Sequence, residues 1–337
     1  MRKKGKLSNK SADIQNKAVI HEQTKTTNSR KSFKLGYDFH TQMELKLMLL
    51  PSVILILVFS FIPLFGLIIA FKQYDPITGI SGIFTSSWNN FRNFKIIFHS
   101  FDFVPMLINT LGINLLNNLV GVPVTLLFAL LLNEVLNSRF KSFIQTVTYM
   151  PHFLSWVIYG GLFITLLSTD GGVVNTILMN LHLISKPIQF LIDPKYFWGI
   201  AVVTSLLKDL GWGAILYLSS MAGIDMELYE AATIDGAGRF KKMLYITIPG
   251  IKPTLMILII FAVSGMLNNN FTQIYIFQNS LNLPASQVID TYVYQIGLQQ
   301  LQFGVATAVG LTKSVFGVLL LVGANYLSRK LTDSGLF

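Results

Sequence analysis

Long apolar runs separated by shorter polar segments make up most of this chain. A helix needs about 20 apolar residues to cross the hydrocarbon core of a bilayer, and six runs reach that length. The predicted membrane helices cover 47–71, 107–132, 144–167, 197–223, 253–277 and 303–327. The pattern therefore predicts an all-α membrane protein, with a six-helix transmembrane domain at 43–337 after a polar tail at 1–42.

The composition agrees with this pattern. Hydrophobic residues make up 52% of the chain and charged residues only 12%, whereas a soluble domain has about 25% charged residues. The tail is rich in Lys, Asn, Ser and Thr and poor in large apolar residues, so we expect it to be disordered. The chain has no cysteine, which excludes disulfides and thiolate metal sites.

The positions of the basic residues predict the topology. A net charge of +10 would suit a nucleic-acid partner, but Lys and Arg gather in segments that the helix pattern places on one side of the membrane. These segments are the tail, the two connections after predicted helices two and four, and the C-terminal end with Arg329 and Lys330. Basic loops stay in the cytoplasm. We therefore expect a multi-pass protein of the bacterial cytoplasmic membrane, in contact with lipid, with both termini inside and no nucleic-acid partner.

The predicted cytoplasmic segment 224–252 has a pattern suited to docking. Residues 225–235 predict a short amphipathic helix with acidic side chains near its positively polarised start, adjacent alanines as a small contact surface, and two glycines that end it. A basic helix then leads to a proline. The residues expected to contact a partner are Glu227, Glu230, Ala231, Ala232, Asp235, Gly236, Gly238, Ile246 and Pro249.

The spacing in this segment resembles the coupling loop of ABC importer permeases. In that family Glu-Ala-Ala is followed by three intervening residues and then Gly, and after nine more intervening residues by Ile-x-Leu-Pro. Glu230, Gly236, Ile246 and Pro249 match the pattern, and Ile248 stands in place of the usual Leu. The resemblance implies a type I ABC importer permease fold and a loop that inserts into a groove of the ATP-hydrolysing subunit.

Three other stretches resemble permeases for complex polysaccharides and lipo-oligosaccharides. They are 63–72, 150–156 and the pair Gly211-Trp212. This resemblance implies an importer of oligosaccharides released from polysaccharides. Its expected partners are a second, homologous permease, two ATPase subunits and an extracellular sugar-binding protein. It also implies that this chain has no cofactor of its own and that Mg-ATP binds the partner ATPase.

Polar residues inside the predicted helices are candidates for the substrate pathway. They are costly to expose to lipid, and transporters bind substrate near the bilayer midplane. The rise of an α-helix places them in one band of depth. Amides suit sugar hydroxyls because they both donate and accept hydrogen bonds, and aromatic rings can stack on sugars. The candidates are Asn114, Asn117, Asn118, Lys208, Asp209, Trp212, Tyr217, Asn268, Asn269, Asn270, Gln273 and Lys313.

Each of these candidates also has a structural interpretation. Lys208, Asp209 and Lys313 could form ion pairs between helices, and the asparagines could hydrogen-bond one helix to another. Adjacent residues on a helix point about 100° apart, so Lys208 and Asp209 cannot face one cavity equally. We interpret Pro151-His152 as a kink and packing feature rather than a metal or proton site.

The chain lacks the motifs of an enzyme. It has no Gly-x4-Gly-Lys-Ser/Thr loop and no His-Glu-x-x-His pair, so we expect no catalytic or metal site. The alternative function is a self-sufficient, ion-coupled secondary transporter, which would need an intramembrane carboxylate relay or two inverted halves. Asp209 is the one candidate carboxylate, and no repeat is visible. A membrane-embedded transferase would need clustered carboxylates or histidines, which the sequence lacks.

Overall fold

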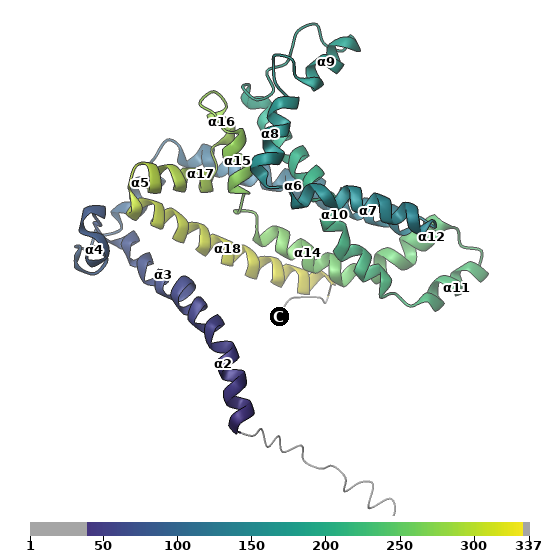
Figure 1. Cartoon of the computed structure of the whole chain (residues 1–337), viewed down its shortest axis with the longest axis horizontal. Helices are drawn as coiled ribbons and strands as arrows, with labels where there is room; N and C mark the ends of the chain where they lie inside the picture. Colours follow the sequence, from purple (N-terminus) through teal and green to yellow (C-terminus); the bar gives the residue numbers. More distant parts are fainter. Residues whose placement is uncertain (1–38, 333–337) are drawn as a thin grey trace, which may run out of the picture. The chain divides into compact units, whose positions relative to one another are not determined.

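The computed structural model describes residues 39–332 (Figure 1). Nearly all of the predicted tail therefore lies outside the described residues, although helix α2 begins at Phe39, within the range assigned to the tail. The described backbone is helical, and an isolated antiparallel bridge joins Lys72 to Trp88. The chain divides into two units. The first ends at Phe65 and the second begins at Gly66.

Helices of different lengths follow one another along the chain. The α-helices are α2 (Phe39–Ile56), α3 (Ile62–Leu64), α4 (Gly79–Thr85), α5 (Arg92–Phe98), α6 (Phe103–Asn133), α7 (Ser138–Phe153), α8 (Trp156–Leu166), α9 (Val173–Asn180), α10 (Pro194–Ala222), α11 (Met226–Ile234), α12 (Arg239–Lys242), α13 (Ile248–Gly250), α14 (Lys252–Ser264), α15 (Phe271–Phe277), α16 (Leu283–Ser286), α17 (Ile289–Tyr294) and α18 (Phe303–Thr332). The 3₁₀ segments are η2 (Phe65–Phe71) and η3 (Pro76–Thr78), and the π-helical segments are η1 (Leu57–Phe61), η4 (Met243–Thr247) and η5 (Gln295–Gln299).

Two of the π-helical segments come just before a proline. Pro63 follows η1 and Pro249 follows η4. A proline has no N–H, and its ring clashes with the carbonyl four residues earlier, so the preceding turn widens while the chain stays helical. From Phe39 onward the first unit remains one helical segment for this reason, and large apolar side chains such as Leu55 and Phe59 are exposed along it.

Four helical segments are long and apolar enough to cross a membrane. They are Lys46–Phe71, Phe103–Asn133, Pro194–Ala222 and Phe303–Lys330. Two pairs of helices are also long and apolar enough when each pair is taken as one bent span. Helices α7 and α8 meet at a bend of 101°, and Arg239–Gly250 and α14 meet at a bend of 63°. The described residues thus hold up to six spans, the number that the apolar runs predict.

The third expected helix, 144–167, is not continuous. The chain turns sharply between α7 and α8, where Leu154 and Ser155 have extended backbone conformations. The Ser155 hydroxyl then accepts a hydrogen bond from the N–H of Ile158 at 3.3 Å and so caps α8. The sequence predicted one membrane segment here and did not locate the bend, because the apolar run continues through it.

The fifth expected helix, 253–277, is also interrupted. Helix α14 ends at Ser264, and α15 begins only at Phe271. The side chain of Asn270 accepts a hydrogen bond from the N–H of Gln273 at 3.0 Å, which caps the start of α15. Asparagine side chains compete with helical hydrogen bonds and favour caps. Asn270 therefore starts a new helix after a break that begins at Gly265, and the run is not one continuous helix.

In the second unit, α10 packs along α6 and against α7, while α14 packs against α18 (Figure 1). Glycines permit two of these close approaches. A Cβ added to Gly112 would lie 2.3 Å from the ring of Trp198, which joins α6 to α10. A Cβ on Gly211 would lie 2.4 Å from the carbonyl oxygen of Thr148 in α7. Small residues let membrane helices pack closely in this way.

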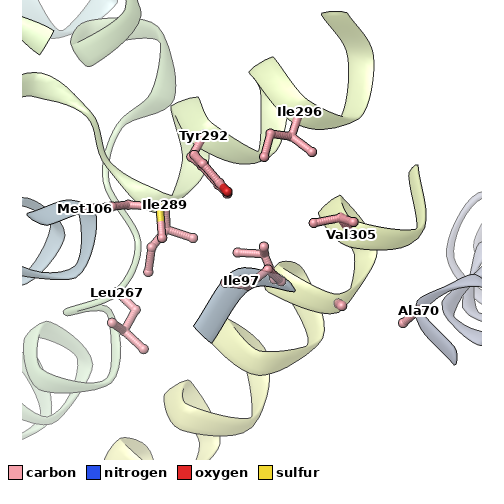
Figure 2. Close-up of a cluster of buried hydrophobic side chains, with 10 residues drawn as sticks. Ala70, Ile97, Met106, Leu267, Ile289, Tyr292, Ile296 and Val305 are labelled. Carbon is pink, nitrogen blue, oxygen red and sulfur yellow. The ribbon is translucent and has the colours of Figure 1, made fainter. Parts of the chain in front are cut away.

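A buried apolar cluster joins α18 to segments far from it in sequence (Figure 2). It contains Ala70, Ile97, Met106, Leu267, Ile289, Tyr292, Ile296, Val305, Ala308 and Val309. These side chains come from η2, α5, α6, α17, η5, α18 and the chain after α14. The cluster fixes α17 against α18, and this contact positions one of the charged pairs described below.

Candidate functional site

Helix α11 begins with a side-chain cap and exposes its acidic residues. The carboxylate of Asp225 accepts a hydrogen bond from the N–H of Glu227 at 3.0 Å. Glu227, Glu230 and Ala231 are exposed, and Ala232 is half-buried. The expected helix at 225–235 is therefore present as Met226–Ile234. Its acidic and small residues are accessible to another protein.

Helix α11 ends in a Schellman motif centred on Gly236. The N–H of Ala237 donates to the carbonyl of Ala232 at 2.8 Å, and the N–H of Gly236 donates to the carbonyl of Thr233 at 3.1 Å. This pattern needs a left-handed residue after the helix, and Gly236 has φ +73°. The reversal directs the chain into α12, whose N-cap is Gly238.

Two side-chain contacts hold α11 against the returning segment Arg239–Gly250. The hydroxyls of Tyr229 and Thr247 are 2.8 Å apart, and the ammonium of Lys242 donates to the hydroxyl of Thr233 at 2.6 Å. Ile246 is half-buried and Pro249 is exposed in this segment. The two arms therefore form one unit, which we call the coupling segment, residues 225–250.

The coupling segment exposes large apolar side chains as well as charges. Ile234 is 87% exposed, and Phe240 and Tyr245 are also largely exposed. Ile234 and Phe240 lie on the two sides of the turn at Gly236, and Tyr245 lies in η4. Large exposed apolar side chains on one short unit suit contact with another protein.

A hollow of about 300 Å³ lies between α6, α10 and α14. Four of the candidate pathway residues, Asn117, Asn118, Asp209 and Tyr217, line it together with the hydroxyl-bearing Ser205 and Thr125, and we call it the polar hollow. Asn117 donates to the Ser205 hydroxyl at 3.3 Å, and Asn118 donates to the Ala262 carbonyl at 3.2 Å. These asparagines therefore both join helices and line the hollow.

The carboxylate of Asp209 binds a histidine from the neighbouring helix. One Asp209 oxygen accepts from Nδ1 of His152 at 2.8 Å. The His152 ring stacks on Trp212, with centroids 4.4 Å apart and planes at 2°. One face of the Trp212 ring, a candidate for sugar stacking, is thus occupied by His152. The sequence interpretation of His152 gave it packing alone, and its bond to Asp209 was missed.

Lys208 caps the C-terminal end of helix α7. Its ammonium donates to the carbonyls of Pro151 and His152 at 2.8 Å each, and to that of Leu154 at 2.6 Å. Lys208 is only 4% exposed. A cation is favourable at a helix C-terminus, where carbonyls have no helical partner. The structure thus gives Lys208 neither of the two roles considered from sequence, a pathway contact or an ion pair with another helix.

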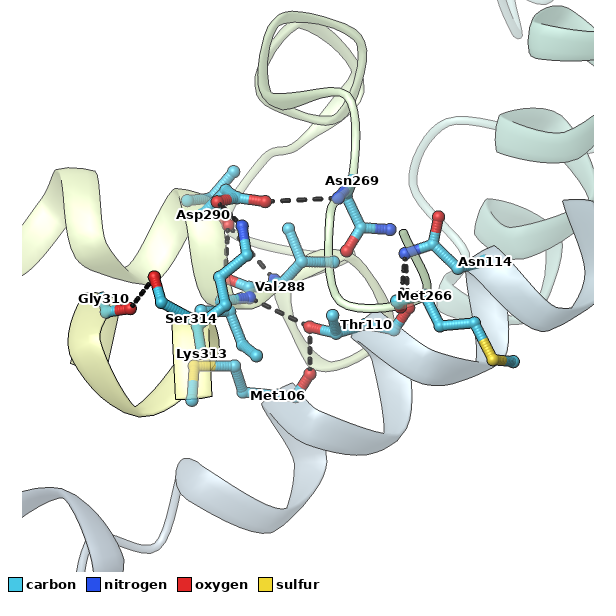
Figure 3. Close-up of polar contacts among 12 residues, drawn as sticks. Met106, Thr110, Asn114, Met266, Asn269, Val288, Asp290, Gly310, Lys313 and Ser314 are labelled. Atoms are coloured by element: carbon cyan, nitrogen blue, oxygen red, sulfur yellow. Dashed lines mark hydrogen bonds and ion pairs between the residues drawn. The ribbon is translucent and has the colours of Figure 1, made fainter. Parts of the chain in front are cut away.

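Lys313 forms an ion pair that joins α18 to α17 (Figure 3). Its ammonium lies 2.5 Å from a carboxylate oxygen of Asp290, and the other oxygen accepts from the N–H of Asn269 at 3.2 Å. Asp290, Lys313 and the exposed Asn268 line a second hollow of about 540 Å³. Six of the twelve candidate residues therefore line one of two hollows, and the candidates do not form the single site expected from their depth.

Asp290 was missed from the sequence, although a signal was present. Asp290 is the only charged residue between Gly265 and Thr312, and the next charged residue along the chain is Lys313. A lone carboxylate in such a stretch needs a partner. The expected membrane boundaries placed Asp290 in a loop, so this pairing was not considered.

Three other candidates use their side chains to join parts of the fold. Asn114 donates to the carbonyls of Thr110 and Met266 at 3.0 Å each. The buried Gln273 donates to the carbonyl of Ala201 at 2.6 Å and to the hydroxyl of Thr204 at 2.9 Å. Asn270 caps α15. Neither hollow includes Asn114, Gln273 or Asn270 in its lining.

Residues 121–333 match the family described as the binding-protein-dependent transport system inner membrane component. The chain belongs to this family. Protein LplB of Bacillus subtilis is 42% identical over 87% of this chain and 91% of its own length. The polygalacturonan/rhamnogalacturonan transport system permease protein YteP of Bacillus subtilis is 39% identical over 88% of this chain and 91% of its own length.

A solved structure shows the same fold. It is a bacterial ABC transporter involved in the import of the acidic polysaccharide alginate, with a TM-score of 0.80 and 34% identity. The match covers 89% of this chain and 99% of that one. The expected ABC importer permease fold is therefore confirmed, and the chain is a multi-pass membrane component of such an importer.

In this permease, removing the Asp290–Lys313 pair is expected to be destabilising. Lys313→Met leaves the partly buried carboxylate of Asp290 with a backbone N–H as its described partner, so we expect a loss of about 2 kcal/mol. The double variant Asp290→Asn/Lys313→Met should lose less than the sum of the two single variants. Thermal unfolding of the purified protein measures all three. Strict additivity would show that the pair contributes nothing to holding α17 on α18.

Proposed function

We propose that this permease subunit moves an oligosaccharide into the cell by alternating access, driven by ATP that partner subunits hydrolyse. The observation that carries the proposal is the coupling segment. It combines the spacing from Glu230 to Pro249 with a capped helix, a Schellman turn and exposed apolar side chains. Such a rigid unit can transmit a movement of a docked partner to α10 and α14, which it connects.

The carbohydrate part of the proposal rests on two supports. YteP is named as the permease of a polygalacturonan/rhamnogalacturonan transport system, and the solved transporter is involved in the import of alginate. The polar hollow offers amides and hydroxyls at Asn117, Asn118 and Ser205, and these groups both donate to and accept from sugar hydroxyls.

The proposed assembly contains four kinds of chain. Two ATPase subunits bind Mg-ATP and receive the coupling segments, and a second, homologous permease completes the pathway. A sugar-binding protein delivers substrate from outside; the alginate importer has been solved in complex with a periplasmic protein that holds an alginate pentasaccharide. We place both termini and the coupling segment in the cytoplasm, as the distribution of Lys and Arg favours.

Single introduced cysteines test this arrangement, because the chain has none of its own. We expect Ile234→Cys, in the coupling segment, to react with a membrane-impermeant maleimide in inside-out vesicles but not in intact cells. Co-expression of the ATPase subunit should then protect it. Ser81→Cys on α4, an exposed position on the opposite side, is the matched control and should react in intact cells only.

Two results would overturn the proposal. One is labelling of Ile234→Cys that ATPase subunits leave unchanged, since a docked helix must be shielded. The other is sugar uptake by liposomes that contain this chain alone, which would favour the ion-coupled secondary transporter.

A further inference from the structure

The two lysines that lie well inside the described spans already bind other groups of the protein. Lys208, near the middle of α10, is buried and donates to three backbone carbonyls of α7 and the turn after it. Lys313 in α18 is paired with Asp290, and its side chain is 17% exposed. Neither is free to bind a carboxylate of a passing sugar. Recognition of carboxylates in proteins relies on such cations.

The polar hollow carries a negative charge, opposite to that of the two lysines. Among the residues that line it, Asp209 is the only one with a formal charge, and the others bear amide, hydroxyl or apolar groups. The Asp209 side chain is 48% exposed, so its carboxylate reaches the open space despite the bond to His152. This bond fixes the carboxylate at the wall of the hollow.

The polar hollow must face a water-filled path or a polar partner, not lipid. Asp209 lies near the middle of α10, and Asn117, Asn118 and Ser205 face the same space. A carboxylate and amides are expensive to expose to hydrocarbon. A place on the route through the assembled importer meets this requirement, and a charge there would act on whatever passes.

We propose that the polar hollow is a binding subsite for an uncharged oligosaccharide and that Asp209, held by His152, excludes sugar carboxylates from it. This inference rests on the proposed function. Asn117, Asn118 and Ser205 bind hydroxyl groups, and Asp209 accepts hydrogen bonds from hydroxyls but repels a uronate. In this respect the chain would differ from the alginate importer, whose substrate is an acidic polysaccharide, and from YteP, since polygalacturonan is also a polymer of acidic sugars.

Equilibrium dialysis against the complete purified importer, without its binding protein, tests the inference. The probes are matched trisaccharides of glucose and glucuronate, galactose and galacturonate, and mannose and mannuronate. For at least one pair, the neutral sugar should bind about tenfold more tightly than its acidic counterpart, as expected for like charges at close range in a partly dry site.

Asp209→Asn should bring this ratio close to one, because asparagine keeps a hydrogen bond to His152 and removes the charge. Asp193→Asn is the matched control, since Asp193 caps the start of α10 outside the hollow and should leave the ratio unchanged. The pKa of Asp193 lies below its usual value because of its hydrogen bond with Lys195, so Asp193 is a carboxylate at neutral pH.

Three results would overturn the inference: a uronate that binds as tightly as its neutral counterpart in every pair, an unchanged ratio in Asp209→Asn, or no binding of any neutral trisaccharide at millimolar concentration. An importer that assembles and hydrolyses ATP but prefers uronates would contradict this inference alone. Failure to bind ATPase subunits would instead contradict the proposed function.

Discussion

Gly236→Pro is expected to abolish ATP-driven uptake while the permease still inserts into the membrane. Gly236 has φ +73° and donates its N–H to the carbonyl of Thr233. Proline fixes φ near −65° and has no N–H, so the Schellman turn cannot form. The coupling segment loses the geometry that directs α11 back to α12. Uptake and ATPase activity of the reconstituted importer measure the effect, and ATPase activity without uptake would mark uncoupling.

Two milder variants at the same position serve as controls. A Cβ at Gly236 meets no other atom within 4 Å, so only the backbone conformation opposes a side chain there. Gly236→Asn should keep most of the uptake because asparagine tolerates the left-handed region, whereas Gly236→Ala should lose about 1 kcal/mol of local stability. Normal uptake in Gly236→Pro would show that this turn plays no part in coupling.

Lys208→Met is expected to destabilise the permease strongly. Methionine preserves much of the side-chain stem but removes the donor to the carbonyls of Pro151, His152 and Leu154. Buried acceptors left without a charged donor should lower the free energy of unfolding by about 3 kcal/mol. The bend between α7 and α8 should loosen first. Thermal unfolding and the yield of monodisperse protein measure the loss.

Lys195→Met on the same helix is the matched control, since the Lys195 side chain is 64% exposed. We expect little change in stability there. A stable Lys208→Met protein with altered sugar binding would return Lys208 to the substrate pathway, as first expected from the sequence.

The coupling segment was predictable because its structure is local. The cap at Asp225, the helix through Glu230 and the turn at Gly236 depend on residues within a few positions of one another. Capping and glycine rules act over that range, so spacing alone located the helix within one residue at either end.

The roles of the buried charges were not predictable in the same way. Lys208 and Asp209 are adjacent, yet one binds the end of α7 and the other faces the polar hollow. Lys313 and Asp290 meet only because the apolar cluster around Ile289 and Val309 holds α17 against α18. Depth along a helix says how far a residue lies from the membrane surface, but not which way it points.

The sequence by itself determined the six apolar segments, the family and the coupling segment, because hydropathy and short-range spacing are written into consecutive residues. Tertiary structure alone decided which polar residues share a hollow. It also decided that both intramembrane lysines are occupied while Asp209 stays accessible. These features depend on which faces of distant helices meet, and that is set by the packing of the whole helical domain.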